Sequence, residues 1–201
     1  MPAYAWEVTT PEQTSVNPWL PWSMVPNAIA ESVPRAWIAS ASLGGAGTGV
    51  LTMVGNLVVP AGRLVSNMTM YSSTTAAVGQ TNLWFALVRQ SDNVVLAQTA
   101  DNLDKGALGA AGGWANNSLL TLAYTTPWRA PSDTPVYGCL LQVATTVTTL
   151  RGYASIAGTI GISPFTVTSS TQTGITTPAS LTSPVAYTAG FGTGLPYVAL
   201  S

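Results

Sequence analysis

The sequence predicts an all-β protein: an antiparallel β-sandwich of jelly-roll type with extended N- and C-terminal arms. Three observations predict this fold. About eight short runs of aliphatic, aromatic and threonine residues follow one another, with glycine or proline between them. No stretch repeats apolar residues at convincing helical spacing. Hydrophobic residues make up 47% of the 201 positions, which is enough to form a core.

Residues 1–34 are expected to form an extended anchoring arm. This region holds six of the fourteen prolines. Each proline fixes its own φ and biases the preceding residue toward extended geometry, so a stable helix is disfavoured. Trp6, Trp19 and Trp22 are the candidate anchoring residues of this arm. Trp19 and Trp22 could equally cap the core of their own domain, and the sequence leaves both interpretations open.

Residues 35–162 are expected to form the sandwich domain. Turn signals separate its strands, among them Pro60-Ala61-Gly62 and Ser91-Asp92-Asn93. In chain order, the strands are expected at residues 35–40, 50–54, 56–59, 64–71, 83–88, 94–98, 117–124, 136–143 and 148–153.

Two of these strands carry a pattern that predicts how they are buried. Residues 64–71 alternate in part, which places Val65, Asn67, Thr69 and Tyr71 on one face. Residues 83–88 are continuously apolar, as expected of a strand that is covered on both sides.

Residues 163–201 are expected to form an uncharged C-terminal arm rich in serine, threonine and glycine. A flexible tail is the alternative. However, hydrophobic residues recur along this stretch, and Phe165, Tyr187, Phe191 and Tyr197 are its candidate interface residues. An arm that is ordered against neighbouring subunits accounts for both the polar composition and the recurring hydrophobic residues.

The scarcity of charge excludes several functions. The chain has six basic residues, seven acidic residues and no histidine, so Ser-His-Asp and Cys-His catalysis are impossible. The basic residues are scattered singly and the net charge is −1, which disfavours binding to nucleic acid. A net charge so close to zero also protects a free monomer poorly against association, which favours a place in a larger assembly.

Few single residues suggest chemistry. Cys139 lies in an apolar run and is expected to be a buried, inert thiol. Asp101 and Asp104 could bind a hard cation, but solvated loop carboxylates are the preferred interpretation, and we expect no metal, cofactor or catalytic residue. Trp114 and Trp128 fall in expected loops and are weak candidates for an exposed contact.

The N-terminus has no basic stretch followed by an apolar one, so we expect no signal peptide. No window reaches the roughly 18 apolar residues of a membrane span. We therefore expect a protein that is made in a cytoplasm and has no membrane partner.

Five segments carry a resemblance to a known family: residues 57–68 (LVVPAGRLVSNM), 72–77 (SSTTAA), 81–87 (TNLWFAL), 98–101 (QTAD) and 148–152 (TTLRG). Together they resemble a β-sandwich module in virion proteins of tailed bacteriophages of actinobacteria. The resemblance covers roughly residues 47–152, and its motifs are structural, so it carries over no catalytic residue. Neither flanking arm takes part in it.

The resemblance implies a non-enzymatic virion protein, assembled in the bacterial host cytoplasm and exposed on the particle as a head-decoration or tail/fibre component. Its expected partners are other virion proteins and sister subunits, with a homotrimer expected by analogy. The alternative is a receptor-binding module that recognises host cell-wall glycans. A glycan-degrading enzyme is disfavoured because paired acid and base groups are missing.

Overall fold

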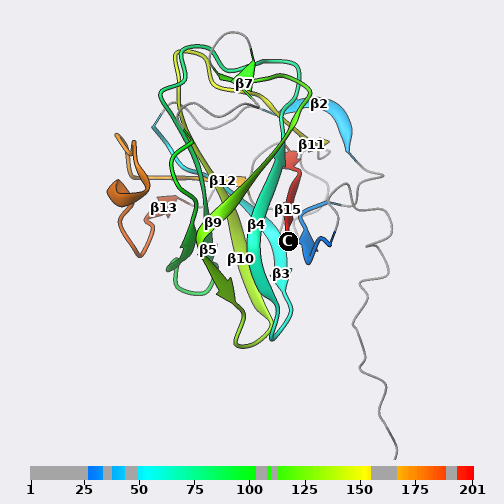
Figure 1. The fold of residues 1–201 in the computed structure, drawn as a ribbon, viewed down its shortest axis with the longest axis vertical. Helices are drawn as coiled ribbons and strands as arrows, with labels where there is room; N and C mark the ends of the chain where they lie inside the picture. The colour runs from blue at the N-terminus through cyan, green and yellow to red at the C-terminus, as the bar shows by residue number, and fades with distance from the viewer. Residues whose placement is uncertain are drawn as a thin grey trace, which may run out of the picture.

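The structure is a computed structural model that describes residues 27–33, 38–43, 49–102, 108–109, 113–154, 167–188 and 194–201. Regular structure in these residues consists of strands and a short 3-10 turn at Pro178–Ser180. The strands form antiparallel sheets that pack against each other (Figure 1). The predicted all-β sandwich is therefore confirmed. Most of the expected N-terminal arm lies outside the described residues.

Two sheets form the body of the sandwich. The four-stranded sheet has the order β1 (Ala30–Glu31), β15 (Val198–Leu200), β4 (Leu64–Tyr71) and β9 (Leu119–Arg129). The six-stranded sheet has the order β13 (Tyr187–Thr188), β12 (Val167–Ser170), β3 (Thr52–Val59), β10 (Thr134–Val143), β5 (Asn82–Arg89) and β6 (Val95–Gln98).

Smaller sheets and single bridges join these layers. A three-stranded sheet has the order β14 (Gly194–Pro196), β11 (Leu150–Ala154) and β2 (Ala39–Leu43), and β7 (Leu108–Gly109) pairs with β8 (Gly113–Trp114). A bridge between Thr99 and Tyr124 connects the β6 and β9 sides of the two large sheets. This contact partly closes the sandwich along that side.

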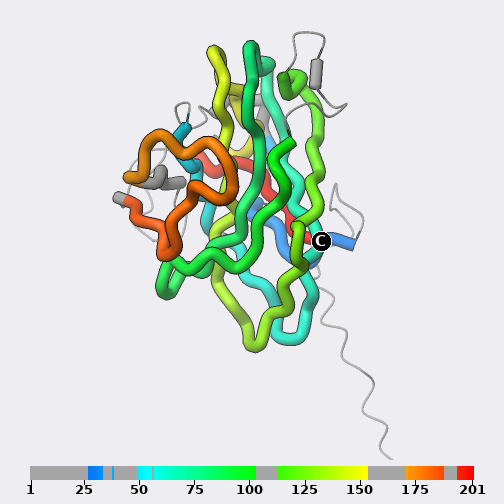
Figure 2. Tube along the Cα trace, turned by 60° about the vertical axis from the view of Figure 1, so that its left-hand side comes forward, coloured from blue at the N-terminus to red at the C-terminus, as the bar shows by residue number. Residues whose placement is uncertain are grey.

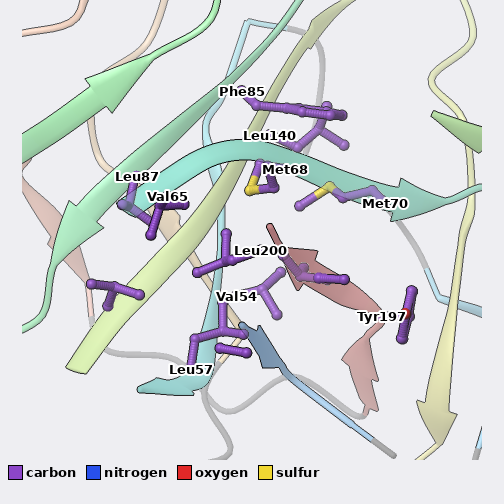
Figure 3. Close-up of a cluster of buried hydrophobic side chains, with 14 of the residues drawn as sticks. Val54, Leu57, Val65, Met68, Met70, Phe85, Leu87, Leu140, Tyr197 and Leu200 are labelled. Atoms are coloured by element: carbon purple, nitrogen blue, oxygen red, sulfur yellow. The ribbon is translucent and has the colours of Figure 1, made fainter. Parts of the chain in front are cut away.

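The main hydrophobic core lies between the two large sheets (Figure 3). From β4 it receives Val65, Met68 and Met70, all fully buried. A register shift between Val65 and Asn67 interrupts the alternation of this strand. The expected common face of Val65, Asn67, Thr69 and Tyr71 is therefore wrong at Val65, because the bulge turns this side chain into the core with Met68.

Strand β5 is buried on both faces, as its sequence predicts. Leu83, Phe85 and Leu87 lie in the main core. The intervening residues, Trp84, Ala86 and Val88, lie in a second hydrophobic cluster on the other face of the six-stranded sheet.

A segment of the chain covers this second cluster. Residues 171–188, which we call the strap, run over the outer side of the six-stranded sheet and end in its edge strand β13 (orange in Figure 2). Ile175 and Val185 are its two buried plugs, and Leu181 and Tyr187 pack beside them half-buried. The strap thus supplies the cover that the continuous apolar pattern of β5 requires.

The described part of the expected C-terminal arm belongs to the sheets. Strand β12 pairs with β3, β14 pairs with β11, and β15 lies between β1 and β4. The apolar side chains of this region are buried in the same chain, which is why it does not extend away as an arm. The jelly-roll topology stays a prediction.

Candidate interaction site

The deepest contacts of the C-terminal region surround β15. This strand pairs in register with β4 through Val198, Ala199 and Leu200, and all three residues are fully buried. Val198 contacts the backbone of β10 so closely that a Cβ at Gly138 would lie 2.7 Å from a Val198 methyl group. Strand β15 is therefore an interior element of the sandwich.

The segment just after residue 26 holds β15 from the other side. Ser32 is completely buried, and its hydroxyl donates to the carbonyl oxygen of Pro196 at 2.7 Å. The same hydroxyl oxygen accepts a hydrogen bond from the amide of Val198 at 2.9 Å. The Tyr197 hydroxyl donates to the carboxylate of Glu31. These contacts join positions more than 160 residues apart in sequence.

The strap is held by hydrogen bonds that use few of its own side chains. The indole nitrogen of Trp84 donates to the carbonyl oxygen of Thr176 at 2.9 Å. The Gln98 side chain donates to the carbonyl oxygen of Pro178 at 3.0 Å. The amide of Val185 donates to the carbonyl oxygen of Asn93 at 2.8 Å. The sheet therefore binds the strap mainly through the strap's backbone and its two apolar plugs.

Two candidate interface residues make contacts within the same chain. Tyr187 packs edge-on against Tyr137, with ring centroids 5.9 Å apart. Tyr197 is fully buried beside β15. The structure places these residues in different hydrophobic clusters: Tyr187 packs against the second cluster, and Tyr197 lies in the main core. Trp6, Trp19, Trp22, Phe165 and Phe191 lie outside the described residues.

The two candidates for an exposed contact lie on strands. Trp114 ends β8, is fully buried and packs edge-on against Phe85, with ring centroids 6.4 Å apart. The expectation of an exposed Trp114 is therefore wrong, because the strand turns the indole into the core. Trp128 belongs to β9 and packs half-buried against the main core. The loop expected at Trp128 is instead the end of an edge strand, which contains Pro127.

Ionisable side chains of the described residues make hydrogen bonds that stabilise turns and strands. The Arg89 guanidinium donates to Asp92 at 2.8 Å and 2.9 Å and holds the pKa of this exposed carboxyl below its usual range. Asp101 accepts a hydrogen bond from the amide of Leu83 at 3.0 Å. Among the described residues, no group of three or more potential metal ligands lies together. Asp104 lies outside them.

Cys139 lies in the second cluster, beneath the strap. Burial raises the pKa of this thiol far above its usual range, so the reactive thiolate form is strongly disfavoured. The expectation of a buried cysteine is confirmed.

Comparisons with known proteins give no relative. No family model, no curated protein and no solved structure matches the chain. In the described residues, no helix is long and apolar enough to cross a membrane.

Two sets of exposed positions in the described chain carry no charged side chain, one on β9 and one on the strap. On β9, every second residue from position 119 points outward and is exposed: Leu119, Thr121, Ala123 and Thr125. On the strap, eleven positions are exposed and carry only hydroxyl, glycine, alanine or proline side chains: Thr171, Thr173, Gly174, Thr176, Thr177, Ala179, Ser180, Thr182, Ser183, Pro184 and Ala186.

The sheet surface to which the strap binds, which we call its seat, is the feature that sequence reasoning missed. Two signals for it were present: residues 83–88 need a cover on both faces, and the C-terminal region contains spaced apolar residues such as Ile175 and Val185. Neither signal alone shows that the strap covers β5, because the residues in contact, such as Trp84 and Thr176, are 92 positions apart in sequence.

Proposed function

We propose that this chain is a non-enzymatic structural protein of a tailed-bacteriophage virion, exposed on the particle as a head-decoration or tail/fibre component. Its partners are other virion proteins and sister copies of the chain, arranged by analogy as a homotrimer. The resemblance of residues 57–68 and 81–87 to virion β-sandwich modules motivates this choice of particle.

The observation that carries the proposal is the uncharged strap on the outside of a well-packed sandwich. No lysine, arginine, aspartate or glutamate occurs after Arg151, yet this part of the chain includes eleven exposed strap positions. Removing charges from water is costly, and the centres of protein interfaces are accordingly depleted in charged residues. A surface of hydroxyl and small apolar groups can therefore be covered by a neighbour without that cost.

The alternative, recognition of host cell-wall glycans, has less support in the described residues. Stacking on a sugar requires an exposed aromatic side chain, and Trp114 is fully buried. Trp128 is half-buried against the core, which leaves only part of its indole for stacking on a sugar.

Mass spectrometry of density-purified phage particles from a lysate that contains the chain tests the proposal. We expect the chain in the particle fraction, and electron microscopy of particles carrying a labelled copy then gives its position. A chain found only in the soluble fraction would refute a virion role.

A salt wash of the same particles tests the character of the attachment. Attachment through uncharged surfaces is weakly screened, so molar NaCl should leave the chain on the particle. A matched phage protein that is attached through ion pairs should be released under the same conditions. Release of this chain by moderate NaCl alone would contradict attachment through uncharged surfaces.

A further inference from the structure

The C-terminal segment, residues 167–201, binds the rest of the chain as a donor binds an acceptor. Its strands β12, β14 and β15 pair with β3, β11, β1 and β4, all of which lie before residue 155. The strap likewise lies on a sheet face formed by β3, β5 and β10. The strands and the sheet face to which the described part of this segment binds therefore all belong to residues 27–154.

The seat of β15 is specific. It aligns Val198, Ala199 and Leu200 with Met70, Thr69 and Met68 of β4. On the opposite side, β1 pairs with β15 and has no other strand partner in the described sheets. Without β15, β1 and β4 would therefore face each other across the width of one strand.

The seat of the strap is specific in another way. It is an apolar sheet face that includes Trp84, whose indole N–H donates to a strap carbonyl oxygen. The strap brings Ile175 and Val185 to this face, and it brings no charged residue. Any copy of the same segment would satisfy both seats equally well.

The connection between acceptor and donor has enough residues for the segment to bind either its own chain or an adjacent copy. Twelve residues, 155–166, separate β11 from β12, and an extended chain of this length spans at most about 40 Å. That length is several times the separation of two packed sheets, which is about 10 Å. The number of connecting residues is therefore compatible with binding of the segment to an adjacent copy.

We propose that residues 167–201 are an exchangeable segment, which occupies the β15 and strap seats of a second copy of this chain when copies are crowded. Domain swapping of this kind needs no new contact, because each seat receives an identical segment. The inference rests on the proposed role in an assembly. A short tether gives an effective concentration of the order of millimolar within one chain, so exchange requires a comparable local concentration, as in a packed array.

Disulfide trapping in the full chain tests the exchange. Thr69 and Ala199 are directly opposite across β4 and β15, and opposite residues of antiparallel strands have Cα separations that suit a disulfide. A Thr69→Cys chain and an Ala199→Cys chain, tagged differently and both carrying Cys139→Ala, are unfolded together. They are then refolded in a redox buffer at about 10 µM and about 1 mM protein.

We expect a disulfide-linked heterodimer whose fraction rises at least severalfold between the two concentrations. The double variant Thr69→Cys/Ala199→Cys at low concentration should close its disulfide within a monomer, which shows that the paired positions can be linked. The matched control replaces Thr69→Cys with Ala123→Cys, which lies exposed on β9, one strand farther from β15.

Two results, obtained with a double variant that closes its disulfide, would overturn the exchange: monomers alone in the mixture at about 1 mM, or as much heterodimer with the Ala123→Cys control. Each leaves the particle experiment unaffected, since a virion protein can keep its C-terminal segment in its own seats. Conversely, a chain that is absent from particles would refute the virion role while leaving the trapped heterodimer intact.

Discussion

Gly152 is the position at which a single methyl group should most damage the attachment of the C-terminal segment. It lies on β11 opposite Pro196 of β14. A Cβ built on Gly152 would lie 2.0 Å from the carbonyl oxygen of Leu195 and 2.6 Å from the Cα of Pro196. Both contacts are with backbone, so no side-chain rotation relieves them, and β14 must move away and draw the adjacent β15 with it.

The cost of Gly152→Ala follows from this geometry. Overpacking a core typically costs 1–3 kcal/mol, and a clash with backbone belongs at the upper end, about 3 kcal/mol. With a urea m-value of about 2 kcal/mol/M, the midpoint of unfolding should fall by about 1.5 M. Equilibrium urea unfolding followed by tryptophan fluorescence measures this shift directly.

Two further glycines make the experiment interpretable. At Gly138 the nearest atoms belong to side chains, a Val198 methyl group at 2.7 Å and the Met68 sulfur at 3.1 Å, so Gly138→Ala should cost less, about 1–2 kcal/mol. At Gly62, no atom lies within 4 Å of an added Cβ and φ is +76°. The destabilisation by Gly62→Ala should therefore reflect only the cost of a left-handed backbone for alanine, about 1 kcal/mol. A Gly152→Ala midpoint no lower than that of Gly62→Ala would refute the steric reasoning.

Three other expectations follow from the contacts described. Ser32→Ala removes both hydrogen bonds between this buried hydroxyl and the β14–β15 region, so unfolding should become easier by about 1–3 kcal/mol, measurable by urea unfolding against an exposed Ser132→Ala control. Ile175→Ala removes a plug of the strap, so Cys139 beneath it should react with a thiol reagent at least tenfold faster, while Leu119→Ala should not change the rate. The hydrogen bond from Arg89 lowers the pKa of Asp92 in the folded state. The pair therefore stabilises the folded state at pH values above the unfolded pKa of this carboxyl, and the contribution is lost as the pH falls through the lower folded pKa. In Arg89→Met, an NMR titration should show the Asp92 pKa returning toward its ordinary value.

The strand pattern of the central domain could be predicted because each strand carries its own signals. The continuous apolar run at 83–88 became β5, with its side chains divided between two clusters. The alternation at 64–71 predicted a strand, but the bulge between Val65 and Asn67 could not be read from it. A bulge depends on how β9 pairs with β4, and one strand's sequence does not contain that register.

The place of the C-terminal segment could not be predicted for a related reason. Its apolar residues predict burial, and the sequence analysis expects neighbouring subunits to cover them. The actual cover of Tyr197 and Val198 is formed by β1, β4 and β10 of the same chain. Composition shows that a surface needs a partner, but only the topology of the chain shows whether that partner is in the same molecule.

The scarcity of charge therefore has two separate explanations. Around β15 the absence of charge follows from folding, because Val198, Ala199 and Leu200 are fully buried and an unpaired charge there would strongly destabilise the folded state. On the strap it does not, because exposed positions such as Thr176 and Thr182 would accept lysine or glutamate without loss of packing. Folding alone leaves their composition unexplained, whereas an assembly in which neighbouring copies cover the strap accounts for it. The strap is accordingly the part of the described surface where evidence for a partner should first be sought.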